Sequence, residues 1–164
     1  FKSLSIGTAT LIARFLELKG IKNVSIKWPN DVYVNDKKIC GILLQGSLPN
    51  YVVIGIGLNV NQICFNDEYR TTPTSISLEL KEKQDINKLE NEIISEVIYM
   101  SEHIDEYIKL AQESDYLNGK QFMYRGSKVK CLGIQDDASL KVVNEHNQEI
   151  LINSSNCIAI LFLV

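Results

Sequence analysis

The 164-residue sequence lacks the features that mark several large classes of protein. It has no run of about 18 apolar residues, so no transmembrane helix and no membrane partner are expected. Its four cysteines show no C-x-x-C spacing, which argues against a cysteine metal site and is typical of a reducing, cytoplasmic compartment. The net charge of −3 gives no electrostatic reason to expect nucleic acid as a partner.

What the sequence does contain is ordinary globular composition, with 45% hydrophobic and 23% charged residues. Apolar residues at helical spacing predict a helix over residues 4–19, a short helix at 75–80, and a long helix from the N-cap Asp85 to about Gln112. Alternation and apolar runs predict strands between the first two helices, at 24–28, 31–34, 37–47 and 51–60. The last of these strands is nearly continuous in apolar residues, so we expect both its faces to be covered.

After Gly119 the pattern changes to short strands separated by turn residues. Five are predicted, at 121–125, 128–134, 139–143, 149–152 and 157–163. So many short strands in so few residues favour a small barrel. The prediction is therefore an α+β domain at 1–118, with a mixed or antiparallel sheet and packed helices, followed by a compact all-β domain at 119–164.

The hairpin at 31–47 places charged residues among apolar ones. A two-residue turn at Asn35-Asp36 pairs Tyr33 with Lys38 and Asp31 with Cys40, so these four side chains share one face. The same register puts Val32, Val34, Ile39 and Gly41 on the other face. A solvated cross-strand ion pair between Asp31 and Lys38 would explain the charges without any function. Lys27 and Asn30 also have explanations that need no function. The aliphatic stem of Lys27 would cover an aromatic ring, and Asn30 would stabilise a turn.

Glycines inside the predicted strands point beyond that explanation. Gly41 interrupts one strand, and Gly55 and Gly57 interrupt the next in "GIGLN". Glycine weakens a strand and often marks the close approach of a ligand. A dinucleotide-binding turn is disfavoured, because no helix follows and the third glycine is missing.

Four segments resemble, in order and spacing, the catalytic core of the biotin–protein ligases, also called biotin–[acetyl-CoA carboxylase] ligases. They are "KWPND" at 27–31, "KKICGIL" at 37–43, "IGIGLNVN" at 54–61 and "PTSISLEL" at 73–80. The resemblance implies a class II synthetase-like ligase core followed by an SH3-like barrel. It also implies a two-step reaction, in which ATP converts biotin to biotinyl-5′-AMP and a lysine of a biotin carboxyl carrier domain then takes the biotinyl group. A homodimer is compatible with the family pattern.

The same resemblance assigns roles to individual residues. Lys38 becomes the cation where the biotin carboxylate meets the α-phosphate, and Asp31 the group that orients or deprotonates the attacking amine. Lys27, Asn30 and Asn59 match contacts to the nucleotide. Biotin contacts other than Lys38 are assigned to Gly41, Ile42, Gly55, Gly57 and Leu58. Mg²⁺ is expected to accompany ATP on phosphate and water, with no protein metal site.

One family feature does not occur in this sequence. Relatives carry a glycine- and arginine-rich loop that closes over the adenylate, and no G-R-G-R segment is found here. The family would place that loop before Phe1, so we expect this stretch alone to turn over poorly. Two alternatives stay open: a lipoate–protein ligase relative, and a non-catalytic module that binds biotin or an adenylate.

Overall fold

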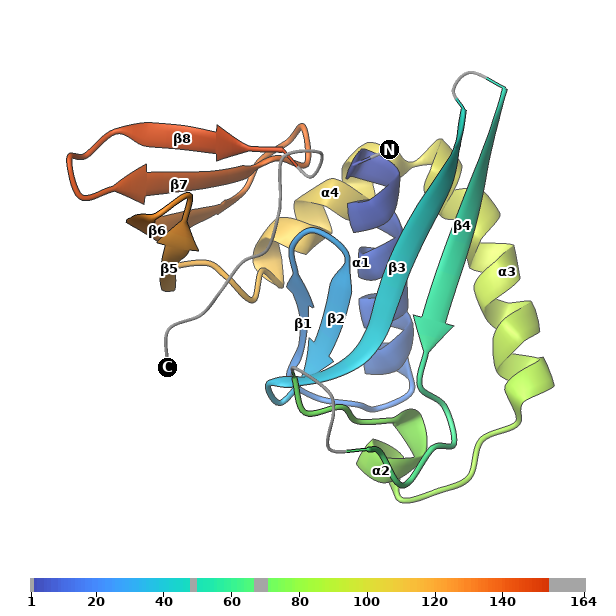
Figure 1. The fold of residues 1–164 in the computed structure, drawn as a ribbon. Coiled ribbons are helices and arrows are strands. Elements are labelled where there is room, and N and C mark those ends of the chain that lie inside the picture. Colours follow the sequence, from blue (N-terminus) through green and yellow to red (C-terminus); the bar gives the residue numbers. More distant parts are fainter. Residues whose placement is uncertain (1, 48–49, 67–70, 154–164) are drawn as a thin grey trace.

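The structure, a computed structural model, describes residues 2–47, 50–66 and 71–153. These residues form two four-stranded antiparallel sheets and four helices (Figure 1), which confirms the α+β class. The first sheet has the order β1 (Val24–Lys27), β2 (Asp31–Val34), β3 (Lys37–Ser47), β4 (Tyr51–Leu58). The second, here called the C-terminal sheet, has the order β5 (Gln121–Tyr124), β6 (Ser127–Ile134), β7 (Leu140–Asn144), β8 (Glu149–Ile152). The helices are α1 (Lys2–Leu18), α2 (Ile76–Leu80), α3 (Ile86–Glu102) and α4 (Ile104–Glu113).

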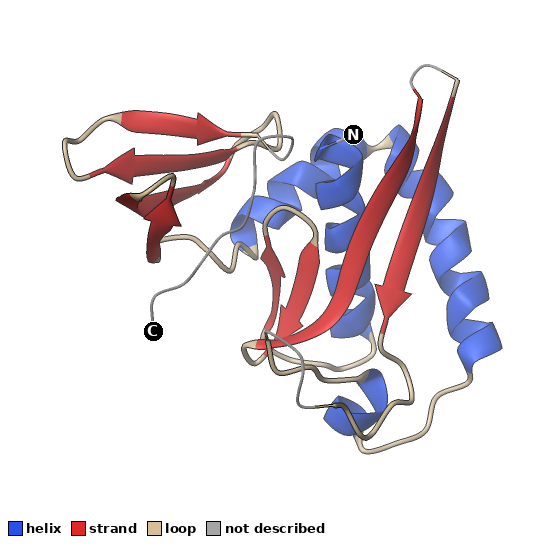
Figure 2. Cartoon of the chain, in the orientation of Figure 1, coloured by secondary structure: helices blue, strands red, loops and turns tan. Residues whose placement is uncertain are grey.

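Helix α1 forms the centre of the core. Eleven of its residues are buried, and it packs against β1, β3, α3 and α4. Gly20 follows the helix with a φ of 95°, a left-handed conformation in which glycine ends a helix at no steric cost. In Figure 2 α1 lies behind the first sheet, and no helix of the described residues covers the face of β3 and β4 that is turned toward the viewer. No helix in the described part of the chain is long and apolar enough to cross a membrane.

The long helix predicted from Asp85 to Gln112 is in fact two helices. Asp85 caps the first as predicted, since its side chain accepts from the backbone N–H of Lys88 at 3.1 Å. His103 then leaves helical geometry, with φ −124° and ψ 34°, and α4 starts after it. The break lets α4 turn and pack against α1. Apolar residues repeat at helical spacing on both sides of the break, so the sequence pattern could not reveal it.

The hairpin between β2 and β3 has the predicted turn but not the whole predicted register. Tyr33 pairs with Lys38 as expected, and Asn35 and Asp36 take the left-handed φ values of 48° and 63° that such a turn needs. The register then shifts between Val32 and Tyr33, where Ile39 is the extra residue of a β-bulge. The predicted pair Asp31–Cys40 is therefore wrong.

Because of the bulge, the two faces of the hairpin differ from the prediction. Asp31 pairs with Gly41, and Val32 pairs with Cys40. Gly41 consequently lies on the face of Asp31 and Lys38, whereas Cys40 is buried on the helix side. The predicted sharing of a face by Asp31 and Lys38 is confirmed.

Strand β4 does not have two covered faces, contrary to the prediction. It is the last strand in the order of the first sheet, and its residues alternate between exposed and half-buried. Tyr51 and Val53 are exposed on the open face, whereas Ile54 and Ile56 are half-buried and line a groove against α3. The prediction failed because glycine and aliphatic residues also occupy the open face of β4, so the strand is apolar throughout although one face is exposed.

The C-terminal sheet contains four of the five predicted strands, with bounds that differ by one residue or less at each end. The fifth predicted strand, at 157–163, lies outside the described residues. Over the described residues the sheet is open, so the predicted barrel is not closed there.

Candidate active site

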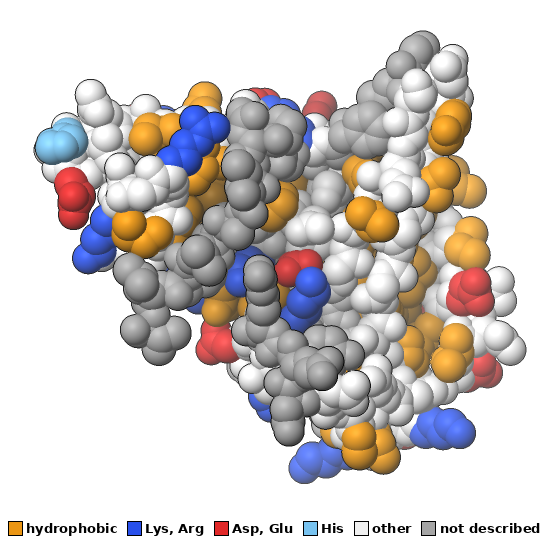
Figure 3. Space-filling model, in the orientation of Figure 1, with side chains coloured by type: hydrophobic (Ala, Val, Ile, Leu, Met, Phe, Trp, Pro, Cys, Tyr) orange, Lys and Arg blue, Asp and Glu red, His pale blue; other side chains and the backbone are white. Residues whose placement is uncertain are grey.

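An ion pair marks the open face of the first sheet where β2 meets β3. Lys38 Nζ lies 2.6 Å from Asp31 Oδ1, and both side chains remain partly exposed. Gly41 makes room for the pair, because a Cβ at this position would lie 3.3 Å from Lys38 Nζ and 3.5 Å from Asp31 Oδ1. On the face drawn in Figure 3, a red and a blue side chain lie together near the centre and orange side chains follow β3 and β4 away from them.

A small hollow of about 190 Å³ adjoins the ion pair. It is lined by Lys38, Ile39, Cys40, Gly41, Gly57, Asn59, Thr71 and Pro73. Residues 71–74 form one wall and are tied to β3 by two backbone bonds, from Lys38 N to Thr72 O at 3.0 Å and from Thr74 N to Lys38 O at 2.9 Å. Asn59 fixes the same wall, since its Nδ2 donates to Thr74 O at 3.0 Å. Hydrogen bonds therefore fix the wall of the hollow formed by residues 71–74, which lies beside the Lys38 ammonium.

Next to the Lys38–Asp31 ion pair, the site continues along β3 and β4 over backbone without side chains. Gly41 pairs with Gly57, and Leu43 pairs with Gly55, so three glycines lie together on neighbouring strands. None of the three has a positive φ, so backbone conformation does not require glycine there. What the glycines provide is a flat surface of peptide groups, here called the glycine wall (Gly41, Gly55 and Gly57). A flat ligand can rest against it closely.

The other polar residues of the motif are anchored beside this wall. Lys27 pairs with Asp31 across β1 and β2, and its Nζ lies 3.1 Å from Tyr33 Oη and 4.9 Å from the centre of that ring. Asn30 Nδ2 donates to Ile42 O at 2.9 Å, and Ile42 N donates to Asn30 O at 2.8 Å. These bonds fix the position of Asn30 at the start of β2.

Two of the predicted site residues lie elsewhere. Ile42 is only 2% exposed and faces the helices, and Leu58 lines the apolar groove between β4 and α3. Each directly follows a glycine of the wall, and neighbours along a strand point to opposite faces. Leu43, which is 62% exposed, takes the open-face position beside Gly55 that sequence reasoning missed. Counting two residues on from Gly41 would have found it.

The thiol next to the site is not a nucleophile. Burial raises the pKa of Cys40 to about 12, and the nearby carboxylate of Asp31 adds to the shift. The thiol therefore stays protonated at neutral pH, where only the thiolate would react. The described residues also contain no group of three or more side chains that could hold a metal ion. The reactive groups on this face are the ammonium of Lys38 and the carboxylate of Asp31.

Comparison with known proteins identifies relatives of this chain. The Biotin/lipoate A/B protein ligase family matches residues 8–59, which include both members of the ion pair and the whole glycine wall. The bifunctional ligase/repressor BirA of Bacillus subtilis is 40% identical over 87 residues, which cover 46% of this chain and 27% of that protein. The chain thus spans about a quarter of the length of this curated relative.

Solved structures share the fold. The apo biotin protein ligase of Aquifex aeolicus superposes with a TM-score of 0.83 at 21% identity, covering 95% of this chain and 73% of that one. The same enzyme in complex with biotin and ATP gives a TM-score of 0.80 at 22% identity, covering 92% and 68%. The motif, the family match over residues 8–59 and the fold agree in indicating that the chain is a relative of the biotin–protein ligases.

Proposed function

We propose that this chain carries the adenylation site of a biotin–protein ligase. The reaction converts biotin and ATP to biotinyl-5′-AMP and pyrophosphate, and then transfers the biotinyl group to a lysine of a biotin carboxyl carrier domain. The Lys38–Asp31 ion pair at the end of the glycine wall carries the proposal. The Aquifex aeolicus relative, whose fold this chain shares, binds biotin and ATP in its complex.

Lys38 reduces the electrostatic repulsion between the two substrates in the first step. An anionic carboxylate must attack the α-phosphate of ATP, and the two negative groups repel each other. An ammonium fixed between them lowers this repulsion and stabilises the charge that grows in the transition state. Asp31 holds Lys38 Nζ at 2.6 Å, so the cation needs little reorganisation when the substrates arrive.

Asp31 then serves the second step. The attacking lysine of the carrier domain must lose a proton before its amine is a nucleophile. Oδ1 of Asp31 lies 2.6 Å from Lys38 Nζ, and the Asp31 side chain is 20% exposed. A carboxylate placed this way can orient the incoming amine and accept its proton.

The remaining residues divide between the two ligands. The glycine wall, with Leu43 beside it, suits the flat bicyclic ring and tail of biotin. Lys27, Asn30 and Asn59 are assigned to the nucleotide, at the charged end of the site. Ile42 and Leu58 support the wall from behind and are no longer proposed as biotin contacts.

Two further proposals concern the rest of the protein. Mg²⁺ enters with ATP on phosphate oxygens and water, because the described residues lack a cluster of ligating side chains. We place the boundary between the catalytic core and a C-terminal domain at residues 118 and 119, where the turn after α4 gives way to β5.

The test separates the two steps in the full natural protein. Lys38→Met should lower biotin-dependent pyrophosphate release at least about 100-fold, a loss typical of removing one transition-state contact. Asp31→Asn should instead impair transfer from preformed biotinyl-5′-AMP to the carrier domain. Lys37→Met is the matched control, because Lys37 is the adjacent, exposed lysine and pairs with Val34 away from the site.

Near-normal pyrophosphate release by Lys38→Met would refute the assignment. Binding of biotinyl-5′-AMP without transfer by the wild-type protein would favour the non-catalytic alternative. Activity with lipoate and none with biotin would favour the lipoate-ligase alternative.

A further inference from the structure

Trp28 ties the candidate active site to the C-terminal sheet. Its indole Nε1 donates a 3.0 Å hydrogen bond to the carbonyl oxygen of Ala138, which lies 110 positions away in the sequence. Trp28 is 1% exposed and Ala138 is fully buried. A buried indole N–H without an acceptor is unfavourable, so this bond fixes where the Trp28 ring sits.

The accepting carbonyl belongs to a tightly held turn, residues 135–139. Ala138 has a φ of 61°, and its N–H donates to Gln135 O at 2.8 Å. Gln135 N–H donates in turn to Ser139 O at 2.8 Å. Asp137 Oδ1 accepts from both the backbone N–H, at 3.0 Å, and the hydroxyl of Ser139. Each peptide around Ala138 O is thereby fixed.

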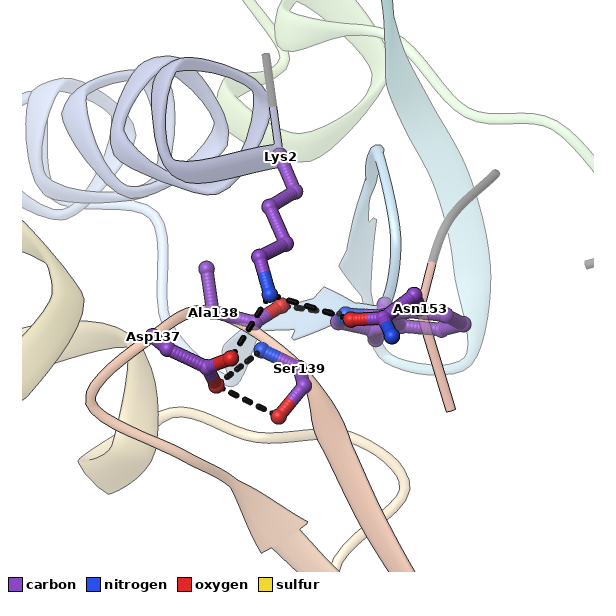
Figure 4. A network of polar contacts seen from close by, with 6 residues as sticks. Lys2, Asp137, Ala138, Ser139 and Asn153 are labelled. Carbon is purple, nitrogen blue, oxygen red and sulfur yellow. Dashed lines mark hydrogen bonds and ion pairs between the residues drawn. The ribbon is translucent and has the colours of Figure 1, made fainter. Parts of the chain in front are cut away.

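The start of α1 holds the same turn from outside. Lys2 Nζ lies 2.7 Å from Asp137 Oδ2 and 3.0 Å from Asn153 Oδ1, as the dashed lines in Figure 4 show. The hydrogen bonds from Lys2 and Ser139 favour the charged form of Asp137 and lower the pKa of its carboxyl to about 2. The turn is thus connected to the main core and to the C-terminal sheet at once.

On its other side, Trp28 leads directly into the site. Residues 28–30 connect β1, which ends at Lys27, to β2, which begins at Asp31. Three parts of the protein hold this connection: the C-terminal sheet through Trp28, α1 through a 3.1 Å bond from Ser5 Oγ to Pro29 O, and β3 through Asn30. Asp31 is the next residue, so the position of the 28–30 connection determines where Asp31 lies.

We propose that Trp28 is a positioning residue of the ligase reaction, through which the 135–139 turn of the C-terminal sheet holds the 28–30 connection and aligns Asp31 with Lys38. The inference rests on the proposed function and deepens it. Trp28 acts through the chain that joins it to Asp31. The C-terminal sheet thereby contributes to catalysis from outside the site.

Three variants test the proposal. Trp28→Phe keeps an aromatic ring and removes only the N–H donor. Ala138→Pro moves the acceptor, because proline requires a φ near −65° and lacks the N–H that bonds to Gln135.

Asn147→Pro is the matched control. Asn147 has a φ of 59°, and its N–H donates to Asn144 O at 3.0 Å in the exposed turn between β7 and β8. It therefore places the same backbone lesion in the same sheet, away from Trp28.

The kinetic readout is transfer from preformed biotinyl-5′-AMP to the carrier domain by the full natural protein, the step assigned to Asp31, with kcat expressed per folded molecule. Trp28→Phe and Ala138→Pro should each lower this kcat about tenfold, the size expected for losing one buried hydrogen bond, with little change in the KM for the carrier domain. Asn147→Pro should lower the unfolding temperature but leave kcat unchanged. Unchanged kcat in Trp28→Phe, with only the stability reduced, would overturn the proposal.

A second readout needs no activity. Trp28 is the only tryptophan in the sequence, so its fluorescence reports on this junction alone. Ala138→Pro should shift its emission to the red and speed hydrogen exchange at residues 28–31, whereas Asn147→Pro should do neither. Absence of activity in the wild-type protein would count against the proposed function. Equal exchange in the two proline variants would independently overturn the coupling.

Discussion

Adding one methyl group at Gly57 should stabilise the protein and weaken its ligand binding. The backbone of Gly57 is not left-handed, and a Cβ there would meet its nearest neighbour, Gly41 O, at an ordinary 3.5 Å. Alanine therefore fits the folded state while reducing the freedom of the unfolded chain. Such a change is worth about 0.4–1 kcal/mol. In a domain of this size, it raises the unfolding temperature by about 1–4 °C.

The same methyl group should damage the site. It projects about 1.5 Å above the glycine wall, on the face that carries Lys38. A ligand that rests on bare peptide groups must move away by a similar distance, and a misplacement of about 1 Å can cost about 100-fold. We therefore expect Gly57→Ala to lower affinity for biotinyl-5′-AMP about 100-fold while the unfolding temperature rises.

Titration calorimetry and thermal unfolding measure the two effects on one sample. Gly46→Ala, farther along the same hairpin, is the control for a glycine needed by the fold. A Cβ at Gly46 would collide with Tyr51 O and lie 2.9 Å from Val52 Cα, so this variant should be destabilised. Unchanged affinity in Gly57→Ala would refute the proposed ligand surface, and a clear loss of stability would refute the steric reasoning.

Three further predictions concern the rest of the molecule. Gly7→Ala should lower the free energy of unfolding by about 1–3 kcal/mol in denaturant titrations, because the added Cβ would overlap Ile104 and lie 2.8 Å from Met100 Sδ; a neutral result would contradict the close approach of α1 to α4. The pKa of Asp137 is lowered from 3.8 to about 2, so its contribution to stability, present above pH 4, is lost as pH falls toward 2. The side chain is 58% exposed, so the effect is small; Asp137→Asn should flatten the acid side of the unfolding profile, and an unaltered profile would contradict the link. Iodoacetamide at pH 8 should label exposed Cys64 and spare buried Cys40 in peptide mass spectra, and equal labelling would contradict the burial.

Local patterns in the sequence predicted much of the fold. The strand alternation, the Asn35-Asp36 turn and the Asp85 cap each depend on a few neighbouring residues, and each was found as expected. The shared face of Asp31 and Lys38 followed from the turn alone, because the pairing nearest a tight turn is set by its geometry.

Features that depend on distant contacts escaped prediction. The break at His103 reflects how α4 meets α1, and the exposure of Val53 reflects the place of β4 at the end of the sheet order. The bond from Trp28 to Ala138 spans the two sheets and leaves no periodic trace in the sequence. The bulge at Ile39 exchanged the faces expected for Cys40 and Gly41 through a shift of one residue.

That bulge makes the length of one short segment matter more than its composition. In a regular strand, residues three apart point to opposite faces, so Lys38 and Gly41 would be separated. The extra residue at Ile39 restores them to one side. Deleting or inserting one residue between the lysine and the glycine would part the cation from the glycine wall even if both were retained. Among relatives, the two-residue interval should therefore keep its length even where its two buried residues are replaced by other apolar residues.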